Sequence, residues 1–128
     1  MRLLLDTCTF LWIVEGSTRL SARARELFED PGNEVSLSAV SAWEVAQKHA
    51  AGKLPLPAPA DQFVIRQRKA HAILALPLDE EAAAHLPRLP ALHRDPFDRM
   101  LICQAIAHGM SILTPDPHIS QYPVRVLW

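Results

Sequence analysis

The chain has 128 residues, of which 49% are hydrophobic and 21% are charged, and its formal net charge is −1. This length suits one domain with a buried core, and the composition excludes a disordered tail. The net charge gives no sign of a strongly basic nucleic-acid-binding surface, although a protein that holds divalent metal on carboxylates can still bind phosphate.

The cysteine content fits a reducing compartment, and the apolar runs indicate neither a membrane span nor a signal peptide. Cys8 and Cys103 are the only cysteines and form no CxxC motif, which argues against a disulfide scaffold and against a structural zinc site. No apolar run approaches the roughly 18 residues of a membrane span. Asp6 interrupts the N-terminal apolar run where a signal peptide would continue it. We therefore expect one domain, residues 1–128, in the cytoplasm.

The start of the chain predicts a strand followed by two helices. Leu3-Leu4-Leu5 is a short apolar run of the kind that is buried on both faces of a parallel sheet. Thr7 and Thr9 are predicted to cap a helix that ends at Gly16, and Ser21 to open a second helix.

The next segment repeats the alternation of strand and helix. Residues 34–38 alternate like a strand, and Ser38 or Ser41 is predicted to cap the helix that follows. That helix should stop near Gly52, and residues 60–71 form another helix.

The clearest helix start in the chain is Asp95-Pro96-Phe97-Asp98. It has a capping aspartate, a proline at the first helical position and an acid three residues after the cap, and the helix should end at Gly109. The remaining predicted elements, a third strand, a helix, a fourth strand and a short fifth strand, cover residues 73–76, 79–86, 111–114 and 124–127. The whole pattern predicts an α/β fold with a parallel sheet, whose ligands gather at the carboxyl ends of the strands.

Five acidic side chains are predicted to reach this one edge of the sheet. Asp6 ends the first strand, and Asp116 follows the fourth. Glu44 lies about one turn into the helix after the second strand, while Asp95 and Asp98 open the helix before the fourth. Four ionised carboxylates about 6 Å apart would repel one another by on the order of 15 kcal/mol, so either some are protonated or a cation lies among them. Ligands that are all oxygen suit Mg²⁺ or Mn²⁺ rather than zinc.

Each acid also has an ordinary structural explanation. Asp95 can cap its helix and Asp98 can complement the helix dipole without any further function. Asp116 can be a turn residue, and Glu44 a solvated helix position. Asp6 is harder to explain, because it follows an apolar strand and has no adjacent cation. A single metal site would account for all five.

Other reactive or aromatic residues carry weaker signals. The six histidines show no HxxxH or HxH spacing. His93, two residues before Asp95, either contacts a phosphate or a leaving group or has a structural role, and we favour the structural role. Cys8 has no base beside it in the sequence, so we expect no nucleophilic role. The three tryptophans are expected in the core or an interface rather than as base-stacking platforms.

Several short motifs follow one another along the chain. They are Leu4-Leu5-Asp6-Thr7, Leu11-Trp12, Ser41-Ala42-Trp43-Glu44, His93-Arg94-Asp95-Pro96-Phe97-Asp98-Arg99-Met100-Leu101-Ile102, Gln104-Ala105, Leu113-Thr114-x-Asp116 and Tyr122-Pro123-Val124. In this order and spacing the chain resembles PIN-domain ribonucleases of the VapC toxin type over essentially its whole length. The HxDPFDR motif, with an N-terminal DT and a later TxD, is the specific part of the resemblance.

The resemblance implies a three-layer PIN-like fold with a central parallel sheet of about five strands flanked by helices. It maps the family's acidic quartet onto Asp6, Glu44, Asp98 and Asp116, which would be catalytic and hold the metal, with Asp95 as a supporting acid. Glu44 would hold a second ion or orient the attacking water. The chain departs from close relatives at one position, Cys8, where they often carry histidine.

The implied activity is endonucleolytic cleavage of RNA, often tRNA or rRNA, with one or two Mg²⁺ or Mn²⁺ ions as cofactor. The family usually acts as a toxin that a VapB-type antitoxin inhibits by blocking the active site with a C-terminal segment, and such toxins commonly form homodimers.

Further roles follow for residues around the quartet. The expected supporting hydroxyls, which would fix the orientation of the carboxylates, are Thr7, Ser41 and Thr114. Arg99 either contacts the scissile phosphate or pairs with an acid, and His93 and Lys48 are further candidates for substrate binding. The other cations that either grip the RNA or merely solvate helix faces are Lys53, Arg66, Arg68 and Lys69.

Two other functions fit the pattern less well. A catalytically silent PIN-fold binding scaffold would not need the intact set of acids. A receiver-like signalling module would need adjacent acids after the first strand, an aspartate ending the third strand and a lysine near the C-terminus. Here Asp6 stands alone, Leu76-Pro77 ends the third strand and the last lysine is Lys69.

Overall fold

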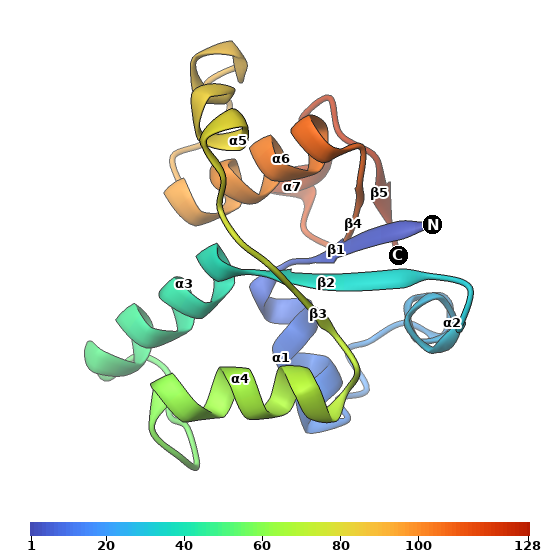
Figure 1. The fold of residues 1–128 in the computed structure, drawn as a ribbon, viewed down its shortest axis with the longest axis vertical. Helices are drawn as coiled ribbons and strands as arrows, with labels where there is room; N and C mark the ends of the chain where they lie inside the picture. Colours follow the sequence, from blue (N-terminus) through green and yellow to red (C-terminus); the bar gives the residue numbers. More distant parts are fainter.

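The computed structural model describes residues 1–128 and contains one parallel sheet with helices on both faces (Figure 1). The strands, in chain order, are β1 (Arg2–Leu5), β2 (Glu34–Ser38), β3 (Leu74–Leu76), β4 (Ser111–Leu113) and β5 (Val126–Leu127). Their order across the sheet is β3-β2-β1-β4-β5, and every pair of neighbours is parallel. The predicted α/β architecture with five parallel strands is confirmed.

The helices form two layers around this sheet. The helices of the first half of the chain are α1 (Thr7–Glu15), α2 (Ala22–Glu29), α3 (Ala39–Ala50) and α4 (Ala60–Ala70). Those of the second half are α5 (Glu80–Ala84), a 3₁₀ turn η1 (Leu86–Arg88), α6 (Pro96–His108) and α7 (Pro117–Ser120). Figure 1 shows α1 and α4 on one side of the strands and α5, α6 and α7 on the other.

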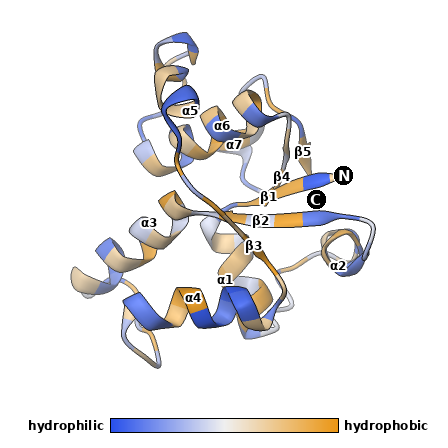
Figure 2. Ribbon diagram, in the orientation of Figure 1, coloured by the Kyte–Doolittle hydropathy of each residue, from blue (hydrophilic) through white to orange (hydrophobic).

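The central strand β1 divides the core into two hydrophobic clusters. Leu3 and Leu5 belong to the cluster beneath α1 and α4, whereas Leu4, which points to the opposite face, belongs to the cluster beneath α6. All three side chains are fully buried, and each such leucine stabilises the fold by about 1.5–3 kcal/mol. In Figure 2 the strands are mostly hydrophobic, while α4 carries both hydrophilic and hydrophobic residues along its length.

The structure corrects the predicted start of α1. The cap is Asp6, whose carboxylate accepts the backbone N–H of Thr9, and Thr7 lies within the helix. An aspartate with extended backbone satisfies the free N–H groups of the first turn at least as well as a threonine, so a single residue separates the end of the strand from the start of the helix. The alternative at the start of α3 is resolved in favour of Ser38, which accepts the N–H of Val40.

The other helices and strands end close to the predicted residues or are shorter than predicted. Asp95 caps α6, which ends at Gly109 in the left-handed conformation with φ 63°. The predicted helix over 79–86 ends as α5 at Ala84, and a 3₁₀ turn that contains Pro87 follows it, because a proline cannot continue the hydrogen-bonding pattern of an α-helix.

None of the helices combines the length and the apolar character needed to cross a lipid bilayer.

Candidate active site

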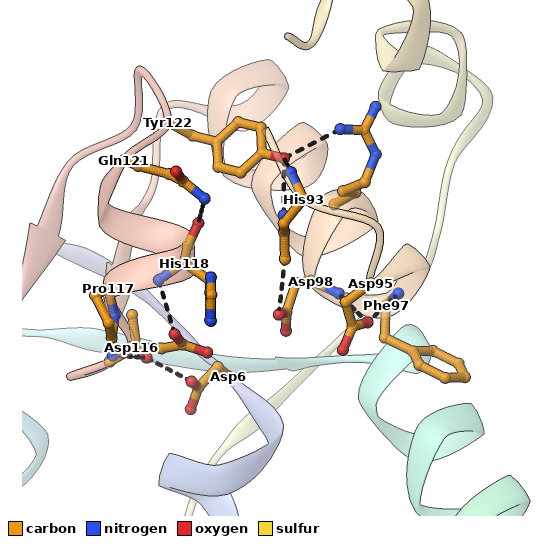
Figure 3. Close-up of polar contacts among 12 residues, drawn as sticks. Asp6, His93, Asp95, Phe97, Asp98, Asp116, Pro117, His118, Gln121 and Tyr122 are labelled. Carbon is orange, nitrogen blue, oxygen red and sulfur yellow. Dashed lines mark hydrogen bonds and ion pairs between the residues drawn. The ribbon is translucent and has the colours of Figure 1, made fainter. Parts of the chain in front are cut away.

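The five predicted acids lie at the carboxyl edge of the sheet, each at the start of a helix or within its first two turns. Asp6, Asp95 and Asp116 are the N-caps of α1, α6 and α7, and Asp98 lies in the first turn of α6. Figure 3 shows the carboxylates of these four aspartates gathered in front of the sheet edge. Glu44 lies on α3, and its charge is close enough to raise the pKa of Asp98. The fold thus collects all five acids at one edge.

Asp6 is buried and held through both of its oxygens. Its Oδ1 accepts the N–H of Thr9 at 2.7 Å, and its Oδ2 accepts the hydroxyl of Thr114 at 2.5 Å. The same Thr114 oxygen accepts the backbone N–H of Asp116 at 3.1 Å, which ties the loop after β4 to the end of β1. Burial raises the pKa of Asp6 above its usual value, the hydrogen bonds lower it, and the charge of Asp116 raises it further.

Glu44 is also buried, and α1 and α3 together fix its orientation. Its Oε1 accepts the hydroxyl of Thr7 at 2.6 Å, and the hydroxyl of Ser41 lies 3.0 Å from that of Thr7. Its Oε2 forms an ion pair with Lys48, one turn further along α3. The structure therefore places the hydroxyls of Thr7 and Thr114 against the acids, whereas Ser41 contacts Thr7 and no acid.

Asp98 carries the clearest electrostatic signature of the site. The pKa of its carboxyl is raised to about 6, chiefly by burial. The hydrogen bond between its Oδ2 and His93 Nε2, 3.1 Å long, lowers this pKa, while the charges of neighbouring acids raise it. Those neighbours are Asp95, Asp116 and Glu44. Because these acids disfavour ionisation of Asp98, a cation placed among them would be bound favourably.

Three of the aspartates keep one oxygen free of protein hydrogen bonds. Asp95 accepts the N–H groups of Phe97 and Asp98 through Oδ1, and Asp116 accepts the N–H of His118 through Oδ1, so Oδ2 of each has no donor in the protein. In Asp98 it is Oδ1 that has none. Each carboxylate is thus anchored by one oxygen and presents the other.

This donor set fits Mg²⁺ or Mn²⁺. The ligands are all carboxylate oxygens, and no three histidine, cysteine or acidic side chains converge on one ion-sized point. Mg²⁺ keeps several of its waters and is commonly held by only one or two carboxylates, so it does not need a closed protein cage. Zinc prefers nitrogen and sulfur ligands, and both ring nitrogens of His93 are already taken up by Tyr122 and Asp98.

The predicted substrate-binding cations are placed differently from one another. Lys48 is half exposed beside Glu44. Arg99 pairs with no acid, because its Nη1 donates to the carbonyl of Pro90 at 2.9 Å and to the hydroxyl of Tyr122 at 3.1 Å. Lys53, Arg66, Arg68 and Lys69 lie on α4 or in the loop before it, and Arg68 donates to the carbonyl of Ile73.

Cysteine and tryptophan side chains have no evident catalytic arrangement. Burial and the nearby charges of Asp6 and Glu44 raise the pKa of Cys8 to about 11, which disfavours the thiolate that a nucleophile requires. Trp43 is 55% exposed and packs edge-on against Phe97, and Trp12 packs against Trp128.

The predicted set of site residues lacks Tyr122, whose buried hydroxyl contacts both His93 and Arg99. It is the single tyrosine of the chain and lies in one of the motifs of the resemblance, but nothing in the sequence indicates that its hydroxyl contacts His93 and Arg99.

Comparison with known proteins identifies the family. The PIN domain family model matches residues 3–124. Ribonuclease VapC16 of Mycobacterium tuberculosis is 37% identical over 71 residues, and the match spans 52% of this chain and 50% of that protein, about half the length of this curated relative.

Solved structures share the fold at low identity. VapBC2 from Rickettsia felis, bound to a DNA fragment from its promoter, has a TM-score of 0.72 at 14% identity, with 100% of this chain and 99% of that chain covered. DNA-bound VapBC from Salmonella typhimurium has a TM-score of 0.69 at 18% identity, with 99% and 97% covered. At these identities the likeness shows the fold. The match to the family model and the shared fold together establish that the chain belongs to the PIN domain family.

Proposed function

We propose that this PIN domain is a Mg²⁺- or Mn²⁺-dependent endoribonuclease and the toxin of a VapBC-type toxin–antitoxin pair. The observation that carries the proposal is the gathering of Asp6, Glu44, Asp98 and Asp116 at one edge of the sheet. There the charge of Asp116 raises the pKa of Asp6, and the charges of Asp116 and Glu44 raise the pKa of Asp98. The partial match to a protein named Ribonuclease VapC16 supports RNA as the substrate class.

The bound ion would supply positive charge at the scissile phosphate and lower the pKa of a coordinated water. Asp98 and Asp116 would hold the ion through their free oxygens, and the lone pairs that remain on Asp6 would accept hydrogen bonds from the waters that Mg²⁺ keeps. The hydroxyl of Thr114 keeps Asp6 in place, and that of Thr7 keeps Glu44 in place. Glu44 would accept a hydrogen bond from the attacking water, and Asp95 would add negative charge and stabilise the start of α6.

The substrate-binding residues divide into two groups under this proposal. Lys48 lies half exposed at the edge of the acids, where its ammonium group can meet an RNA phosphate. His93 and Arg99 are turned toward Tyr122 rather than toward solvent, so a role in positioning the acids suits them better than contact with RNA.

The proposed partners are a structured RNA, a VapB-type antitoxin and a second copy of the chain. The solved structures that share the fold include several VapBC complexes, some of them with DNA, which supports an antitoxin partner. We further propose a cytoplasmic location, which fits an RNA substrate.

A cleavage assay with matched variants tests the activity. Asp6→Asn and Asp98→Asn should abolish Mg²⁺-dependent cleavage of total tRNA and rRNA while the protein stays folded. Asparagine caps α1 as well as aspartate does at position 6, and at position 98 it can still accept a hydrogen bond from His93. Asp61→Asn, an exposed aspartate on α4, is the matched control and should cleave normally. Full cleavage by both site variants would refute the site. A wild-type protein that cleaves no RNA with either ion would instead indicate a silent scaffold.

A further inference from the structure

The hydroxyl of Tyr122 is the centre of a hydrogen-bond network that ends at Asp98. It lies 3.0 Å from the backbone nitrogen of His93, 3.1 Å from Arg99 Nη1 and 2.8 Å from His93 Nδ1. Tyr122 as a whole residue is 3% exposed, and the side chains of His93 and Asp98 are 12% and 17% exposed. These three side chains are therefore largely shielded from water, so the hydrogen bonds among them are made with one another rather than with solvent.

Counting donors and acceptors fixes the direction of each bond. A backbone N–H and a guanidinium N–H can only donate, so the His93 backbone and Arg99 occupy both lone pairs of the tyrosine oxygen. The phenol proton is then left with one partner, His93 Nδ1, which must accept it. A neutral imidazole that accepts at Nδ1 carries its proton on Nε2, which faces Asp98 Oδ2 at 3.1 Å.

The neighbouring ring limits how far the imidazole can move. The ring of His118, in α7, stacks on that of His93 with a centroid separation of 5.7 Å and an interplanar angle of 3°. His93 is thus held on one face by His118, at Nδ1 by Tyr122 and at Nε2 by Asp98. Figure 3 shows the chain of contacts from Tyr122 through His93 to Asp98.

We propose that Tyr122 is a positioning residue that, through the Nε2–H form of His93, holds Asp98 by Oδ2 and leaves Oδ1 turned toward the divalent-ion site. The tautomer of His93 follows from these hydrogen bonds alone, whereas its effect on ion binding rests on the proposed function. Arg99 takes part as the cation that keeps the phenol oxygen an acceptor. His93 contacts Oδ2 of Asp98, the oxygen turned away from the ion site, and does not touch the substrate.

Nitrogen-15 NMR of the metal-free protein tests the tautomer. At about pH 8, His93 should carry a proton on Nε2 and none on Nδ1, as the directions of its hydrogen bonds require. Tyr122→Phe, which removes only the hydroxyl, should move the Nδ1 resonance toward the value of a nitrogen without a hydrogen-bond donor. A wild-type His93 that carries its proton on Nδ1, or on both nitrogens, would overturn the proposal.

Mn²⁺ binding, followed by titration calorimetry without RNA, tests the consequence for Asp98. Tyr122→Phe and His93→Leu should weaken Mn²⁺ binding by about tenfold or more, the usual effect of losing a partner that orients a metal ligand. His93→Gln, which keeps a side-chain N–H donor, should recover much of the affinity. Equal affinities for the wild type, Tyr122→Phe and His93→Leu would overturn the positioning role, as would a Gln variant as weak as the Leu variant when both are folded.

These measurements separate the inference from the proposed function. A wild-type protein that binds Mn²⁺ in the predicted way but cleaves no RNA would refute the nuclease and leave the network in place. A wild-type protein that cleaves RNA, together with a Tyr122→Phe variant that binds Mn²⁺ and cleaves normally, would refute the positioning role alone.

Discussion

Replacing Asp98 by asparagine should make the metal-free protein more stable at neutral pH. The pKa of Asp98 is raised from 3.8 to about 6 in the folded state, so its ionisation opposes folding. A shift of about two pKa units corresponds to about 3 kcal/mol of unfolding free energy. Below the unfolded-state pKa the carboxyl is protonated in both states and this penalty is absent. It grows as the pH rises from 3.8 and is complete above 6.

Urea unfolding in EDTA measures this penalty. Asp98→Asn should exceed the wild type in unfolding free energy by about 3 kcal/mol at pH 8 and by about half as much at pH 5. Asparagine can still accept the N–H of His93, so the change removes charge and little else. Asp61→Asn, in an exposed position, should show no such difference. A variant that is no more stable than the wild type at pH 8 would refute the reasoning, as would an advantage that does not shrink toward acid pH.

Three further predictions concern other parts of the chain. Iodoacetamide should alkylate Cys8, whose pKa is about 11, slowly at neutral pH, and faster once bound Mg²⁺ offsets the charge of the nearby acids. Peptide mass spectrometry measures both alkylation rates. A rate that does not change with Mg²⁺ would place the ion elsewhere. Lys48→Met should tighten Mg²⁺ binding in calorimetry because it removes a cation from Glu44, and weaker binding would contradict this. Gly109→Ala, at φ 63°, should lower the unfolding free energy by about 1 kcal/mol in urea, and an unchanged midpoint would argue against the left-handed cap.

The sheet and most helix positions could be predicted because each depends on local signals. The apolar run Leu3-Leu4-Leu5 can be buried on both faces only in the middle of a parallel sheet, and it lies there. Asp95 and Gly109 mark the two ends of α6 by capping chemistry alone. The sequence predicts the wrong cap for α1 because aspartate and threonine are both good caps, and the choice between Asp6 and Thr7 depends on where β1 ends in three dimensions.

The site was predictable as a set of acids but not as a network. Topology alone places Asp6, Glu44, Asp98 and Asp116 at one edge, since the carboxyl ends of parallel strands coincide there. The partner of each carboxylate is a long-range contact, as between Thr114 and Asp6 or between His93 and Tyr122, and depends on side-chain directions that no local pattern encodes. For the same reason the sequence could not show that Arg99 points to Tyr122 rather than to an acid.

The central claim is that distant acids form one site for a divalent cation, and anomalous diffraction from crystals soaked in Mn²⁺ tests it most directly. The account predicts a manganese peak in contact with Asp98 and Asp116, close to Asp6, and no peak there in crystals of Asp98→Asn. Manganese bound only elsewhere on the wild-type protein, at a concentration that supports RNA cleavage, would contradict it.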